Sequence, residues 1–152
     1  MAMMRITHAQ SGMEIIPLTQ CLGLLASQPV GRLAFVAGDQ PMVLPVNYAL
    51  YGGVIVFRTG EGSKLEAAAG AKVAFEADAI DVARHTGWSV VVQGTAEEIT
   101  DDHEWFSEVL RQGAAPSWLP GVVGHYVRIN PTLISGRRLP APVGTHTDVL
   151  IK

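Results

Sequence analysis

Three apolar stretches follow one another in the first half of the chain, with only short turns between them. Gly38-Asp39 separates the first stretch from the second, and Gly52-Gly53 separates the second from the third. Glycine beside Asp or a second Gly, between two apolar runs, is typical of a tight β-hairpin. The segment therefore predicts three antiparallel strands in a meander, at residues 30–37, 40–50 and 54–59.

The second half of the chain continues this pattern, and three short helices lie between or beside the strands. The further strands are expected at residues 71–80, 88–100 and 122–139, with Gly94 bending or bulging the middle one. The helices are expected at residues 19–27, 63–69 and 101–110. Six strands joined mostly by hairpins predict a mainly β fold, a small antiparallel β-barrel with peripheral helices. We expect an irregular arm at 1–17, one domain at 18–139 and a tail at 140–152.

The composition narrows the class of protein. Hydrophobic residues make up 48% of the 152 residues and charged residues only 16%, so an apolar interface with another chain is expected. The net charge of −3 and the lack of a Lys/Arg run argue against nucleic acid as a partner. No apolar stretch approaches the roughly 20 residues of a spanning helix, and we expect no membrane partner, no signal peptide and a cytoplasmic location.

Cysteine and histidine give no sign of a metal site. The single cysteine, Cys21, excludes an intrachain disulfide and a cysteine-based zinc site, and its apolar surroundings predict a buried, inert thiol. The five histidines form no pair with the spacing of metal ligands. No combination of residues predicts a particular catalytic side chain.

Residues 54–66 carry the clearest chemical signal of the chain. The pattern indicates a strand, a tight loop and the start of a helix, with Arg58, Thr59, Ser63 and Lys64 gathered around the loop. A helix N-terminus presents unpaired N–H groups, an Arg can fork onto two phosphate oxygens, and a Lys adds a point charge. The segment therefore predicts a phosphate site, although strand alternation places Arg58 and Thr59 on opposite faces.

Ser63 and Glu66 have the spacing of a capping box, which places the start of the helix near Ser63. The same segment also allows a second interpretation. Glu61, however, would repel a phosphate unless its side chain points outward, and the glycine spacing matches neither GxxxxGK[ST] nor GxGxxG. An ordinary strand-to-helix turn with solvated charges remains the alternative.

Six motifs, in order along the chain, resemble those of the FMN-binding split-barrel proteins, the pyridoxamine 5′-phosphate oxidase-like superfamily. They are VGRLAFV (30–36), PVNYAL (45–50), VFRTGEGSKL (56–65), VAFEAD (73–78), GWSVVVQGTAEEI (87–99) and ISGRRL (134–139). The small flavin-nucleotide-binding subgroup is the most similar. The resemblance implies a six-stranded antiparallel split β-barrel that binds FMN at the interface of a homodimer, with Arg58, Thr59, Ser63 and Lys64 around the phosphate.

The resemblance also implies contacts to the flavin ring. The backbone of Pro45 and Val46 and the side chain of Asn47 would face the ring, while Trp88 and Ser89 would approach it from the second subunit. The alternatives are an amide at a strand edge for Asn47 and a packing role for Trp88. One arginine of the pair Arg137 and Arg138 would also reach the site from the second subunit; Arg138 is the one we assign, although the sequence does not decide between them.

The function that the resemblance implies is an FMN-dependent oxidoreductase acting on a small molecule. In such a protein the flavin carries out the redox chemistry, and the protein supplies binding and orientation. Two alternatives stay open: a non-catalytic flavin-binding module that acts as a sensor or carrier, and a reductase that uses a deazaflavin.

Overall fold

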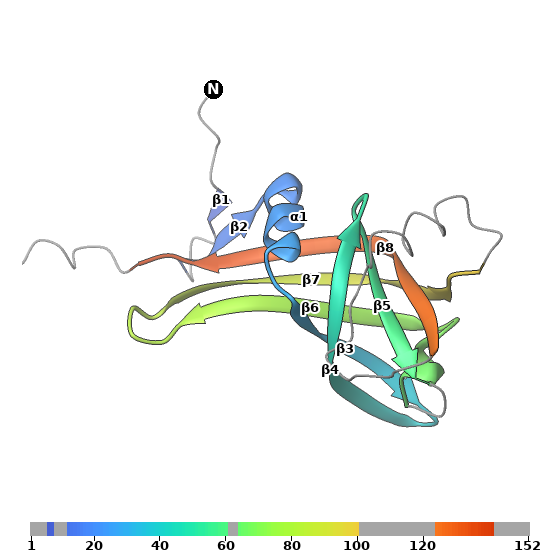
Figure 1. Ribbon diagram of the computed structural model, residues 1–152. Helices are drawn as coiled ribbons and strands as arrows, with labels where there is room; N and C mark the ends of the chain where they lie inside the picture. Colours follow the sequence, from blue (N-terminus) through green and yellow to red (C-terminus); the bar gives the residue numbers. More distant parts are fainter. Residues whose placement is uncertain (1–5, 8–11, 61–63, 101–123, 142–152) are drawn as a thin grey trace, which may run out of the picture.

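The computed structural model describes residues 6–7, 12–60, 64–100 and 124–141. The helix predicted at 101–110 and most of the predicted tail lie outside these residues. Six strands form the body of the fold (Figure 1). They are β3 (Val30–Ala37), β4 (Gln40–Tyr51), β5 (Val54–Gly60), β6 (Lys72–Asp81), β7 (Thr86–Glu98) and β8 (Gly124–Leu139).

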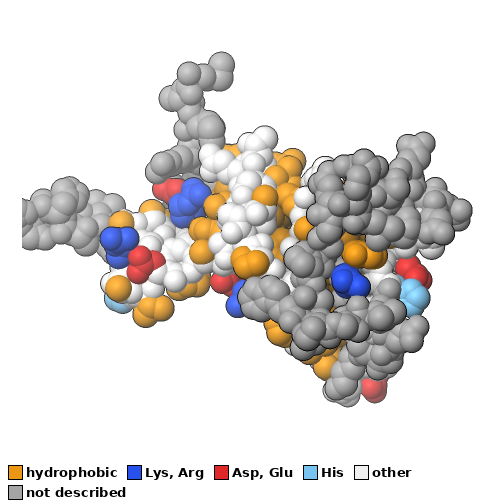
Figure 2. Space-filling view, viewed as in Figure 1, with side chains coloured by type: hydrophobic (Ala, Val, Ile, Leu, Met, Phe, Trp, Pro, Cys, Tyr) orange, Lys and Arg blue, Asp and Glu red, His pale blue; other side chains and the backbone are white. Residues whose placement is uncertain are grey.

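These strands close into a ring. Each strand pairs antiparallel with two neighbours, in the order β3–β4–β5–β8–β7–β6, and β6 pairs again with β3. The predicted mainly β fold, a six-stranded antiparallel split barrel, is confirmed. Figure 2, in the same view, shows hydrophobic side chains on the surface over β3 and β4 and beside the β6–β7 hairpin.

The glycines lie at the turns and the bulge that the sequence predicted. Ala37 pairs with Gln40 around a turn at Gly38, and Gly52 and Gly53 both have positive φ angles, 53° and 83°, in the turn between β4 and β5. The pairing of β7 with β8 shifts register between Gln93 and Gly94, which confirms the predicted bulge. A Cβ atom at Gly94 would lie 2.2 Å from the carbonyl oxygen of Asn130, so the two strands approach too closely there for any side chain.

The N-terminal segment differs from the prediction of an irregular arm. Two short strands, β1 (Ile6–Thr7) and β2 (Glu14–Ile16), pair with each other, and β2 also pairs with β8. Ile16 is buried opposite Gly136 of β8, so its burial fixes the short strand against the barrel. A strand of three residues is too short to show a period-2 pattern in the sequence.

The helices also differ in detail from the expectation. Helix α1 (Leu18–Ala26) begins and ends one residue earlier than the predicted range 19–27, and it follows Pro17 without a side-chain cap. The segment after β5 forms a single 3-10 helix, η1 (Lys64–Ala68), where an α-helix over 63–69 was predicted. The N–H of Gly70 donates to the carbonyl of Ala96 at 2.8 Å, and this bond to β7 ends the helix after five residues. Among the described residues, no helix has the length and apolar character needed to cross a membrane.

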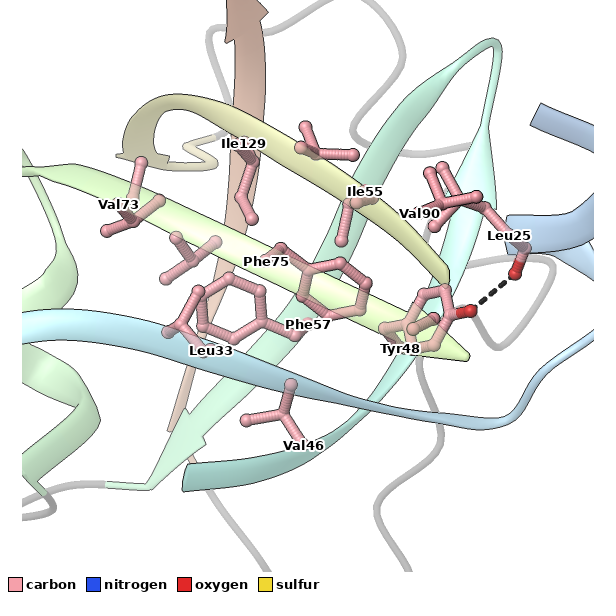
Figure 3. Close-up of a cluster of buried hydrophobic side chains, with 14 of the residues drawn as sticks. Leu25, Leu33, Val46, Tyr48, Ile55, Phe57, Val73, Phe75, Val90 and Ile129 are labelled. Carbon is pink, nitrogen blue, oxygen red and sulfur yellow. Dashed lines mark hydrogen bonds between the residues drawn. The ribbon is translucent and has the colours of Figure 1, made fainter. Parts of the chain in front are cut away.

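The core fills the ring and continues under α1 (Figure 3). The Phe75 and Tyr48 rings meet edge to face, with centroids 4.6 Å apart, and the Tyr48 hydroxyl donates a hydrogen bond to the carbonyl of Leu25 at 2.5 Å. This bond ties the helix to β4 across the barrel end. Cys21 is fully buried in the same cluster, as predicted, and burial raises the pKa of its thiol.

Candidate functional site

Arg58 lies on the outer face of β5. Residues Ile55 and Phe57 of this strand are buried in the core, so alternation turns Arg58 to the opposite side, as the sequence predicted. Its guanidinium lies 5.2 Å from the centre of the Tyr126 ring, and Tyr126 is its cross-strand partner on β8. A guanidinium at this distance from an aromatic face gains a cation–π interaction, which holds the charge near the end of the strand.

The other residues of the predicted phosphate loop are placed differently. Thr59 points into the barrel, is 1% exposed, and donates its hydroxyl hydrogen to the carbonyl of His125 at 3.5 Å. Ser63 lies outside the described residues, and Lys64 is described in its backbone alone, as the first residue of η1. A single 3-10 turn offers little of the dipole on which the helix argument for a phosphate rested. The phosphate roles of Thr59, Ser63 and Lys64 stay predictions.

Asn47 and Pro45 share the outer face with Arg58. Tyr48 of β4 pairs with Phe57 of β5, and both side chains are buried, so the next residues, Asn47 and Arg58, lie outside on adjacent strands. Pro45 lies two residues further along the same face of β4, where it pairs with Arg32 of β3. Val46 lies between them with its side chain in the core, so it can offer only its backbone to a ligand on this face.

Ser89 also points outward, because its neighbour Val90 is buried in the core. Ser89 pairs with Asp78 of β6 on one side and with Arg137 of β8 on the other. Arg58, Asn47 and Pro45 thus lie together on the outward side of β5 and β4, while Ser89 lies on β7, two strands from β5 around the ring. We call the outward side of β5, β4, β3, β6 and β7 the outer sheet face.

Trp88 and Arg138 belong to a different part of the molecule. They pair across β7 and β8 and line a cleft of about 410 Å³ beside the β6–β7 hairpin, together with Leu139 and Pro140. Arg138 also pairs with the buried Glu14 of β2, with 4.0 Å between Nη1 and Oε2. Arg137 is exposed on the other side of the strand, so the two arginines serve different surfaces.

The sequence did not indicate a charged cluster at the centre of the outer sheet face. Arg32 Nη1 of β3 lies 3.8 Å from Glu76 Oε1 and 3.6 Å from Asp78 Oδ2 of β6. Burial, with the neighbouring Asp78, raises the pKa of Glu76 to about 7, while Arg32 lowers it. Glu76 and Asp78 have the spacing of one strand face, but the pairing of β6 with β3 could not be deduced from the sequence.

Comparison with known proteins identifies the family. The sequence profile of the pyridoxamine 5′-phosphate oxidase family matches residues 18–138, which is most of the chain. The chain therefore belongs to this family, as its motifs suggested.

Three relatives show how far the similarity extends. An uncharacterized protein of Mycobacterium tuberculosis is 36% identical over 146 residues, covering 90% of this chain and 93% of its own. The structure of an FAD-binding protein from Mycobacterium smegmatis superposes with a TM-score of 0.69 at 37% identity, covering 82% of this chain and 96% of that one. An FAD-binding protein from Mesorhizobium loti superposes with a TM-score of 0.65 at 28% identity, covering 84% of this chain and 99% of that one.

Proposed function

We propose that this chain binds a flavin nucleotide on the outer sheet face and acts as a flavin-dependent oxidoreductase on a small molecule. The observation that carries the proposal is that Arg58 and Asn47 lie next to each other on the outward side of β5 and β4, with Pro45 two residues further along β4. FMN is the cofactor that the sequence resemblance implies. FAD is the second candidate, because two structural relatives in the family are described as FAD-binding proteins.

The residues present fit such a cofactor. Arg58 supplies a fixed cation at the end of β5, suited to a phosphate group. Pro45 is exposed on β4 and has no N–H, and Val46 turns its side chain inward, so a flat ring on this side would meet the Pro45 and Asn47 side chains and the backbone of Val46 between them. The Asn47 and Ser89 side chains can donate to and accept from the polar edge of the ring. When bound, the flavin would supply the capacity to accept and donate electrons.

We further propose a homodimer with two equivalent flavin sites between its subunits. The outer sheet face carries exposed apolar side chains, including Val36 at 54% and Val43 at 64% exposure. A monomer seldom leaves so many apolar side chains together on one face. In this arrangement Arg58 and β4 of one subunit hold the flavin, and Trp88, Ser89 and Arg138 of the other close over it. The small number of charged residues in the chain supports the same proposal.

A titration of the purified chain with FMN, FAD and riboflavin, followed by flavin fluorescence, tests cofactor binding. We expect FMN or FAD to bind at one flavin per chain, and riboflavin to bind more weakly because it lacks the phosphate. Absence of binding by all three would overturn the proposal.

A second assay tests turnover in the flavin-loaded protein. Oxidation of NADH or NADPH with quinones and nitro-compounds as acceptors is expected to exceed that of the same concentration of free flavin. A loaded protein no faster than free flavin with every donor and acceptor would indicate a carrier or sensor in place of an oxidoreductase. Preferential binding of a deazaflavin would change the cofactor and leave the site in place.

A further inference from the structure

The Arg32–Glu76–Asp78 cluster lies in a hollow of about 380 Å³ on the outer sheet face. Apolar side chains make up most of the remaining wall, namely Ala34, Val43, Ala74 and Val91. A second hollow, of about 550 Å³, adjoins the first and shares Ala34, Val43 and Ala74 with it. Three charged groups therefore lie within an otherwise apolar stretch of surface.

Few other charges face this cluster. On β3 the charged residue that faces the two carboxyl groups is Arg32, which already belongs to the cluster. The residues of β7 opposite Glu76 and Asp78 are Val91 and Ser89, which carry no charge. Pro45 and Val43 of β4 lie beyond β3 and do not titrate. At the rim of the face are Lys72, near one end of β6, and Arg137, across from Ser89 on β8. Among the described residues, the protonation of the centre of this face is thus set by the two carboxyl groups and Arg32.

The charge of the cluster depends on one proton. With both carboxyl groups ionised, Arg32, Glu76 and Asp78 sum to one negative charge. With Glu76 protonated, the sum is zero. Burial and the adjacent Asp78 bring the pKa of Glu76 to about 7, so Glu76 exchanges this proton near neutral pH.

A second copy of the chain fits this face on charge grounds. Two-fold symmetry brings the same surface of each copy together, so a patch with no net charge meets its equivalent without repulsion. A patch with a net negative charge would meet a like charge, and closing the interface would also remove water from an uncompensated carboxylate. The protonated cluster therefore suits an interface between copies better than the ionised one.

We propose that the Arg32–Glu76–Asp78 cluster takes up a proton when the outer sheet face of one copy closes on that of a second copy. Self-association then tightens in acid and weakens in alkaline solution. The inference rests on the homodimer proposed above and adds a control of its assembly.

The direction of this pH dependence follows from the loss of water at the interface. Closing the interface removes water from the carboxyl pair, which raises its pKa further, so the associated state binds more protons than the free chains. Association is strongest below the pKa of the free chain, near 7, and is lost as the pH rises above it. Each cluster can change the dimer dissociation constant by up to about tenfold per pH unit, and the two clusters of a dimer together by up to about a hundredfold.

Sedimentation velocity over a range of concentrations, at pH values from about 6 to about 8.5, measures the dimer dissociation constant directly. We expect the constant to change little below pH 7 and to rise steeply above it. Glu76→Gln removes the carboxyl group that titrates near 7, so its dissociation constant should stay low and nearly flat over this pH range. Glu66→Gln removes an exposed carboxylate from η1, which contributes no residue to the Arg32–Glu76–Asp78 cluster, and should follow the unchanged chain.

The outcomes separate the two proposals. A chain that is monomeric at every pH and concentration would overturn both this inference and the homodimer. A dimer whose dissociation constant does not change with pH would overturn the proton linkage alone. If Glu76→Gln does not fold, calorimetry of the unchanged chain replaces the variant. The heat of diluting the dimer is measured in buffers of different ionisation enthalpy, and the difference gives the number of protons released on dissociation. Release of about one proton per chain on dissociation supports the inference, and none contradicts it.

Discussion

Replacement of Arg58 by alanine should weaken FMN binding much more than it weakens the fold. The guanidinium lies 5.2 Å from the Tyr126 ring, so it is already held in place before a ligand arrives. Loss of a charge-assisted contact to a phosphate costs about 1.5–3 kcal/mol, which corresponds to a Kd roughly 10- to 150-fold higher. Loss of the cation–π contact should lower the free energy of unfolding by only about 0.5–1 kcal/mol.

Fluorescence titration measures the affinity, and urea denaturation measures the stability of the same samples. Riboflavin should lose less than about threefold in affinity, because it lacks the phosphate that Arg58 would contact. Arg84→Ala, which removes an exposed arginine from the β6–β7 turn, is the matched control and should leave FMN affinity unchanged. An Arg58→Ala protein that binds FMN as tightly as the unchanged chain would refute the assignment of Arg58 to the phosphate.

Three further predictions concern the barrel that holds this site. Tyr48→Phe removes the hydrogen bond to the Leu25 carbonyl and should lower the free energy of unfolding by about 1–2 kcal/mol, which an unchanged urea midpoint would contradict. Burial raises the pKa of Tyr48 to about 12, so the unfolded chain loses this proton first and stability should fall between pH 10 and 12, less so in Tyr48→Phe. Gly94→Ala places a Cβ 2.2 Å from the Asn130 carbonyl and should cost on the order of 1–3 kcal/mol, so a variant melting with the unchanged chain would count against the bulge.

Local chemistry made much of the fold predictable. Turns at Gly38 and Gly52-Gly53 have backbone angles that favour glycine, so the sequence alone gave the boundaries of the hairpins. The bulge at Gly94 was also predictable, because this glycine lies in the middle of a long strand. Strand alternation also placed Arg58 and Thr59 on opposite faces, which the burial of Thr59 confirms.

Features that depend on distant pairing were not predictable. The Arg32–Glu76–Asp78 cluster forms because β3 pairs with β6, although two other strands lie between them in the sequence. Likewise, β2 is recognisable only through its pairing with β8. The segment after β5 has the composition of an α-helix, but it forms a 3-10 helix of five residues, and the N–H of Gly70 just beyond it bonds to Ala96 of β7. In each case tertiary contacts decided what local preference could not.

Mixed dimers test most directly the central claim that each flavin lies between two subunits. One chain carries Arg58→Ala and the other Trp88→Ala, with different tags so that the mixed species can be purified. If each site uses Arg58 of one subunit and Trp88 of the other, one site loses both residues and the other keeps both. The account predicts one tightly bound flavin per mixed dimer. Two bound flavins, or none, would contradict it.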